Sequence, residues 1–133
     1  MMVSLNYWAI LVAAVVNMVI GMVYYSPMAF GGLYGKLMGR KSTDMKIKGY
    51  EFPVQFVASL VLVYVLAHFL GYAGAVDWIG GAMGGFWAWL GFIAATSIAG
   101  FLWEGQSFNF YLLTNGEFLI MMLVSGAILG AWR

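Results

Sequence analysis

Four long apolar stretches, separated by short polar segments, dominate the pattern of the chain. They cover residues 6–26, 53–73, 78–103 and 108–131. A helix of about 20 apolar residues is long enough to cross the ~30 Å hydrocarbon core of a bilayer. The pattern therefore predicts an all-α integral membrane protein, a four-helix bundle forming a single domain over residues 1–133.

Residues that favour helix ends stand at the boundaries of these stretches. Ser26 and Pro27 close the first stretch, and Pro53 suits the first turn of the second. Asp77 and Ser107 are good N-cap residues for the third and fourth. The predicted boundaries therefore agree with local chemistry as well as with hydropathy.

The polar segment 27–52 predicts the orientation of the bundle. Between Phe30 and Met38 its apolar residues recur at helical spacing, which predicts a short interfacial helix after the first span. The segment also holds five of the six cationic residues of the chain, which are Lys36, Arg40, Lys41, Lys46 and Lys48. By the positive-inside rule, loop 27–52 is cytoplasmic and both termini lie outside.

Composition excludes several classes of protein. Hydrophobic residues make up 64% of the chain and charged residues only 8%, against about 25% in ordinary soluble domains. No basic face is available for nucleic acid. Without cysteine, and without a phosphate loop, zinc motif or nucleophile elbow, we expect no enzyme, no cofactor and no metal site. Met18 and Met22, one turn apart, are only a weak Cu(I) candidate because methionine commonly fills apolar cores.

Glu117 is the residue that most needs an explanation, because a carboxylate within a membrane span must face protein, water or a partner. At 1.5 Å per residue, Glu117 and Asn17 both lie about 14 Å from the loop 27–52 end of their spans. Tyr64 and Thr96 are at similar depth, and His68 follows Tyr64 by one turn. These five residues are the predicted intramembrane polar site.

Two interpretations of this site remain open. In the structural one, Glu117 is a protonated carboxyl hydrogen-bonded to a neighbouring helix, with Asn17 as the partner, and His68 is a neutral imidazole satisfied within the bundle. In the functional one, Glu117 exchanges a proton or binds a cation, Asn17 and Tyr64 complete the site, and His68 relays protons.

Small residues predict where the helices pack, because close approach of backbones holds membrane helices together. The predicted packing residues are Ala13, Gly21, Gly85, Gly91, Gly126 and Gly130. Glu104 lies at the C-terminus of the third span, where the helix dipole disfavours an anion. We therefore expect a structural salt bridge from Glu104 to Lys36 or Arg40.

Short motifs spread over nearly the whole chain resemble one family. They are Tyr25-Ser26-Pro27, Phe30-Gly31, Glu104-Gly105, Asn115-Gly116 and Trp132-Arg133. The chain resembles the family catalogued as domain of unknown function 1761, small and mostly bacterial four-span membrane proteins. The resemblance implies the four-span architecture already predicted and no particular activity. The predicted location is the bacterial inner membrane. The chain departs from it at Tyr24, where the family often has tryptophan, and at Glu117, where an uncharged residue is expected.

Three function classes follow. The first is an accessory or assembly subunit that packs in the lipid with itself or with a larger membrane complex, with Glu117 and Asn17 as polar contacts. The alternative is a small proton- or cation-coupled transporter using Glu117, by loose analogy with the small multidrug resistance proteins, whose glutamate lies in the first span. A lipid-modifying or redox enzyme without a familiar motif is the third.

Overall fold

The computed structural model describes residues 4–26, 29–38 and 49–132. All regular elements in these ranges are helical. The elements are α1 (Tyr7–Tyr24), α2 (Gly31–Met38), α3 (Glu51–Ala73), α4 (Trp78–Ala88), the π-helix η2 (Trp89–Ala94), α5 (Ala95–Trp103) and α6 (Phe108–Ala131). Because α4, η2 and α5 are continuous, four helices are long and apolar enough to span a membrane. The prediction of an all-α chain is confirmed.

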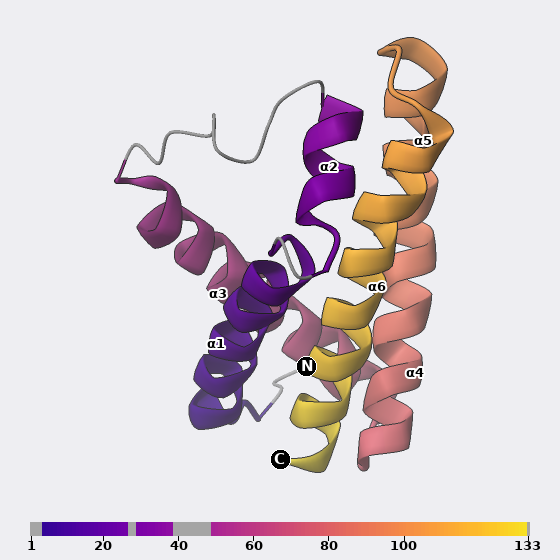
Figure 1. Ribbon diagram of the computed structural model, residues 1–133. Coiled ribbons are helices and arrows are strands. Elements are labelled where there is room, and N and C mark those ends of the chain that lie inside the picture. The colour runs from indigo at the N-terminus through magenta and orange to yellow at the C-terminus, as the bar shows by residue number, and fades with distance from the viewer. Residues whose placement is uncertain (1–3, 27–28, 39–48, 133) are drawn as a thin grey trace.

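The two ends of the chain meet at one end of the bundle. The Asn6 side-chain amide donates to the Trp132 carbonyl at 3.1 Å, and the same side chain caps α1 by accepting from two backbone N–H groups. Asp77 and Ser107 cap the third and fourth spans, accepting from Gly80 N at 2.7 Å and Phe110 N at 3.0 Å. Helix α1 ends and helix α3 begins toward the opposite end (Figure 1).

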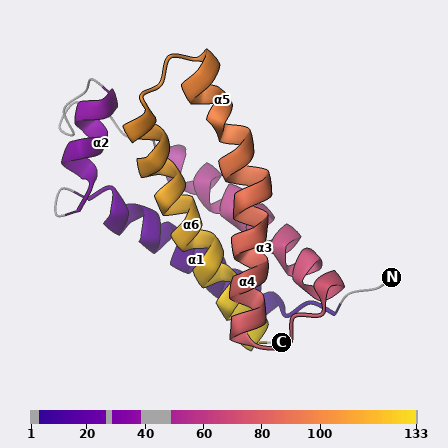
Figure 2. The same ribbon diagram turned by 90° about the vertical axis from the view of Figure 1, so that its right-hand side faces the viewer.

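Helix α6 is the centre of the bundle and packs most closely against α4. In Figure 2, α6 lies between α2 and the third span. A Cβ at Gly81 would overlap the Gly126 carbonyl, and one at Gly85 would overlap the Met122 carbonyl. Gly130 is likewise pressed against the Asp77 carbonyl. These backbones touch only because glycine has no side chain, as the small-residue pattern predicts.

Gly91 does not take part in this contact, although the small-residue pattern predicted that it would. It is exposed, and a Cβ there would meet nothing within 4 Å. A stripe at fixed spacing stays on one face only in a regular α-helix, whereas Gly91 lies inside the π-helix Trp89–Ala94, where the turn is wider. The π-helix therefore rotates Gly91 away from α6.

Helix α2 forms where a short helix was expected, but it does not lie flat across the end of the bundle. It stands alongside the first turns of α6 (Figures 1 and 2). The Tyr34 ring lies between those of Tyr25 and Phe110, at centroid distances of 4.6 and 5.9 Å. These aromatic contacts attach α2 to the bundle.

Helix α3 packs along only part of its length. Its second half is anchored by Val63, Leu66 and Leu70, which are almost fully buried. Its first half diverges from α1 and α6, so that the Glu51 end stands apart from the bundle in Figure 1. Ser59 is the only buried residue of that half. A space therefore opens between α1, α3 and α6 at the end from which segment 27–52 leaves.

Candidate functional site: a cavity that reaches Glu117

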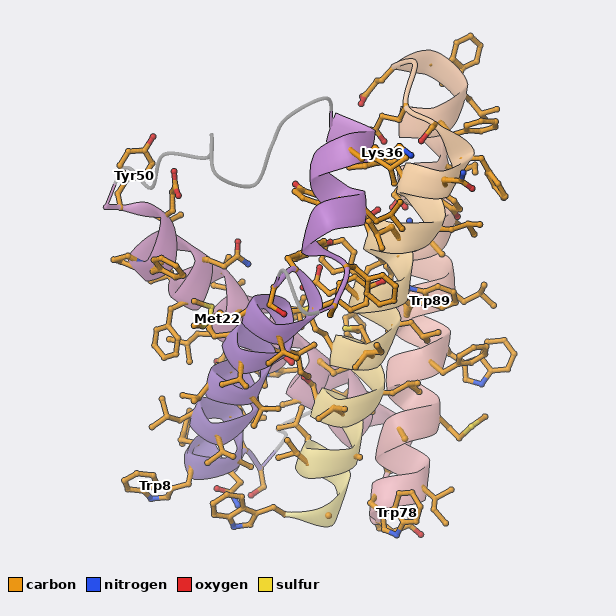
Figure 3. All side chains as sticks on the ribbon, viewed as in Figure 1. Trp8, Met22, Lys36, Tyr50, Trp78 and Trp89 are labelled. Carbon is orange, nitrogen blue, oxygen red and sulfur yellow. The ribbon has the colours of Figure 1, made fainter. Side chains whose placement is uncertain are left out.

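The space beside the diverging half of α3 is a cavity of about 680 Å³. Three helices and the residues that follow α1 line it. The lining residues are Asn17, Met18, Gly21, Met22, Tyr25, Ser26, Glu51, Phe52, Gln55, Ser59, Glu117, Phe118 and Met121. Figure 3 shows Met22 between α1 and α3, and Tyr50 at the far end of α3. The cavity thus extends from the end of the bundle to the depth of Glu117.

The Glu117 carboxylate lies against α1. Glu117 is only 8% exposed, and its Oε1 is 3.2 Å from the position that a Cβ on Gly21 would occupy. Gly21 therefore makes room for the carboxylate, which is why a small residue stands here on α1. Tyr25, one turn further along, is within hydrogen-bonding reach of Glu117.

The hydroxyl of Tyr25, which follows the last residue of α1, is a donor toward this carboxylate. Its burial, and then the charge of Glu117 and the hydrogen bond to it, raise the pKa of Tyr25. A tyrosine that keeps its proton can donate to a carboxylate. Tyr25 also contacts Tyr34 of α2, so α2 indirectly holds a group that touches Glu117.

Asn17 lies one turn before Gly21 and is 2% exposed. Ser125 Oγ of α6 donates to Asn17 Oδ1 at 2.8 Å. Asn17 Nδ2 is buried and has no hydrogen-bond partner in the described part of the chain. Buried polar groups are usually paired, so this covered donor of a cavity-lining residue stands out as one that the described residues leave unsatisfied.

The family model for proteins of unknown function called DUF1761 matches residues 8–130. The chain belongs to the DUF1761 family. No curated protein and no solved structure matches it. Two residues of the motifs that suggested this family, Tyr25 and Ser26, line the cavity. Since DUF1761 carries no assigned activity, function has to be inferred from the site.

The structure brings together only part of the predicted polar site of this DUF1761 protein. Asn17 and Glu117 share the cavity. Tyr64 is 43% exposed, and Thr96 is also exposed and donates to the Phe92 carbonyl of its own helix at 2.7 Å. His68 Nδ1 is 2.9 Å from the Tyr64 carbonyl. Tyr64 and Thr96 thus match Glu117 in approximate depth but do not line its cavity, and neither does His68, one turn beyond Tyr64.

Several cavity residues were not predicted from sequence. Gln55 and Ser59 stand one turn apart on α3, with Ser59 Oγ donating to the Ala14 carbonyl at 3.3 Å, and Glu51 lines the cavity near the start of α3. Their four-residue spacing puts them on one helix face, a signal that was available. The sequence does not show where that face lies, because its position depends on how α3 diverges from α1 and α6.

The predicted salt bridge of Glu104 stays a prediction. Glu104 is exposed at the C-cap of α5, and Lys36 is exposed on α2. Arg40 lies outside the described residues. Neither Glu104 nor Lys36 lines the cavity.

A second polar cluster joins α6 to the π-helix. Trp89 Nε1 donates to the Asn115 carbonyl at 2.9 Å, as Trp89 reaches toward α6 in Figure 3. Ser97 Oγ donates to Asn115 Oδ1 at 3.1 Å, and the Tyr111 hydroxyl donates to the Ala94 carbonyl at 2.7 Å. Asn115 Nδ2 donates to the Tyr111 carbonyl at 2.9 Å. Because these groups satisfy one another, the cluster stabilises the helix contact rather than forming a binding site.

Proposed function

We propose that this DUF1761 protein is a small proton- or cation-coupled transporter in which Glu117 binds a cationic substrate. The observation that carries the proposal is the cavity that reaches Glu117 from one end of the bundle. Ionisable side chains at membrane depth that face a cavity commonly mark an ion or substrate pathway.

The lining favours an organic cation. Pockets of about 300–1,000 Å³ suit small organic ligands. Calcium and magnesium need about six oxygen ligands, whereas much of the wall near Glu117 consists of Met18, Phe118 and Met121. The apolar side chains around the Glu117 carboxylate fit a cation that carries hydrocarbon groups.

The two ends of the bundle differ in the way that transport requires. At the end of the diverging α3 the cavity is open, whereas toward the termini the core is closed by Ala9, Ala13, Val63, Leu66 and Leu70. A site open at one end and closed at the other is one state of an alternating-access cycle. With loop 27–52 placed in the cytoplasm of a bacterial inner membrane, the open end faces inward.

The test of this proposal is cation binding by the protein in lipid nanodiscs. We expect Glu117→Gln to weaken the binding of tetraphenylphosphonium, measured by equilibrium dialysis, by about tenfold or more, which corresponds to about 1.4 kcal/mol. The matched control is Glu104→Gln, which removes one carboxylate outside the cavity and should change affinity by less than about twofold. Equal binding by Glu117→Gln and the native protein would refute the cation site.

The accessory-subunit function is supported by a different observation. Tyr64, His68 and Tyr72 follow one face of α3, with ring centroids 4.6 and 6.5 Å apart, and Tyr64 and Tyr72 are exposed. Lipid tails offer no hydrogen-bond partner to the second imidazole nitrogen of His68, so this face favours contact with another protein or a second copy. An accessory role would therefore centre on α3 and not on Glu117.

A further inference from the structure

The side-chain amide of Asn17 places a second requirement on a ligand of the cavity, in addition to the positive charge that suits the Glu117 carboxylate. Its Oδ1 is occupied by Ser125 Oγ at 2.8 Å, whereas Nδ2 is buried without a partner among the described residues. Asn17 itself lines the cavity. A ligand that presents an oxygen acceptor to Nδ2 would satisfy a donor that the protein leaves unpaired.

The spacing of the two polar groups follows from α1. Glu117 Oε1 is packed beside Gly21, and Asn17 lies four residues before Gly21 on the same helix face. Four residues of α-helix rise about 6 Å. The positive charge and the acceptor of a ligand that uses both groups are therefore separated by about 6 Å along α1.

The other side chains of the cavity wall determine which chemical groups suit the remaining atoms of the ligand. Met18 and Met22 border the polar pair on α1, Phe118 and Met121 on α6, and Phe52 on α3. Thioether and aromatic side chains are polarizable and adapt to apolar groups of varied shape. The positive charge can also lie over an aromatic face.

We propose that the ligand of this cavity is an amphipathic organic ammonium ion carrying a carbonyl or ether oxygen, with the ammonium at Glu117, the oxygen at Asn17 Nδ2 and the hydrocarbon part against the methionines. This inference rests on the proposed function, because it specifies the cation bound at Glu117. Asn17 then distinguishes ligands with an oxygen acceptor from those without one, and Glu117 binds the positive charge.

The test compares two probes of equal charge and chain length. Hexanoylcholine carries an ester a few bonds from its trimethylammonium group, whereas nonyltrimethylammonium has methylenes in the same positions. Dissociation constants are measured in nanodiscs by competition with tetraphenylphosphonium. Because the two probes partition differently into lipid, the ratio of their dissociation constants in each variant is divided by the same ratio in the native protein, and partitioning cancels in this quotient.

We expect Asn17→Leu to reduce the relative preference for the ester by about fivefold or more compared with the native protein. Asn17→Asp is the matched variant, since it keeps the shape and the acceptor for Ser125 but removes the Nδ2 donor, and it should lose the preference as well. Glu117→Gln should weaken both probes and keep the preference for the ester.

The possible failures are distinct. If both probes bind in a Glu117-dependent way but Asn17→Leu and Asn17→Asp leave their ratio unchanged, the acceptor requirement is wrong and the cation site stands. If neither probe depends on Glu117, the proposed function fails and this inference with it. If only Ag(I), a mimic of Cu(I), binds and Met18→Leu abolishes its binding, the methionines form a metal site and the organic ligand is excluded.

Discussion

Replacing Gly81 with alanine is expected to destabilise the bundle by about 1–3 kcal/mol. The added Cβ would overlap the carbonyl of Gly126, and a backbone carbonyl within a helix cannot move aside as a side-chain tip can. The α4 and α6 backbones would have to separate along their whole contact. The effect is measured as the unfolding midpoint in mixed detergent micelles with increasing sodium dodecyl sulfate.

Gly91→Ala is the matched control, because it makes the same change in the same span. Its Cβ would meet nothing within 4 Å, so the change should be neutral or stabilise the helix by up to about 1 kcal/mol. Opposite effects at Gly81 and Gly91 would support the rotation imposed by the π-helix. Equal losses of stability at both positions would show that the third span packs along its full length as a regular helix.

Replacing Gly21 with leucine is expected to abolish cation binding while the protein still folds. The Cβ at this position would point at Glu117 Oε1, 3.2 Å away, and the remaining atoms of leucine would extend into the cavity. The carboxylate is the end of a flexible side chain and can shift, so the cost to folding is small, whereas the space for the ligand is lost. We expect at least about a tenfold loss of tetraphenylphosphonium affinity.

Gly91→Leu controls for the added hydrocarbon, since it places the same side chain on an exposed face outside the cavity. Its affinity for the cation should equal that of the native protein. Native-like binding by Gly21→Leu would mean that the cation does not enter beside Glu117. An unfolding midpoint measured on each variant separates loss of the site from loss of the fold.

The fold was largely predictable from the sequence because it depends on local signals. Length and hydropathy predicted the four spans, and residue type and position alone identified Asp77 and Ser107 as helix caps. Even α2 was indicated by apolar spacing alone. Its orientation was not, because the contact between Tyr34 and Phe110 joins residues far apart in the chain.

The candidate site was predictable in depth but not in direction. A rise of 1.5 Å per residue places Glu117, Asn17 and Thr96 at comparable depths whatever the packing. Which of them face one another depends on helix rotation, and Thr96 follows a π-helix that changes the rotation of its span. Helix rotation does not mislead in this way for Asn17, because α1 is a regular helix whose small-residue face packs against α6.

The cavity itself could not be predicted. It exists because the first half of α3 diverges while Val63, Leu66 and Leu70 hold the second half. Both halves are similarly apolar in sequence, so composition does not distinguish them. For this reason the sequence favoured Glu117 as a polar contact in an accessory subunit, whereas the cavity favours a ligand at the same residue.

The most direct measurement of the central claim, that water and solutes reach Glu117 through this cavity, is thiol labelling of Met18→Cys and Val19→Cys. The chain has no cysteine, so each variant carries a single thiol. Met18 lines the cavity, whereas its neighbour Val19 is 52% exposed on another face of α1 and does not line it. In nanodiscs, a charged maleimide that cannot enter lipid should react about tenfold faster or more with Met18→Cys, because thiolate formation requires water. Equally slow labelling of both thiols would contradict the claim and leave Glu117 as a buried packing residue.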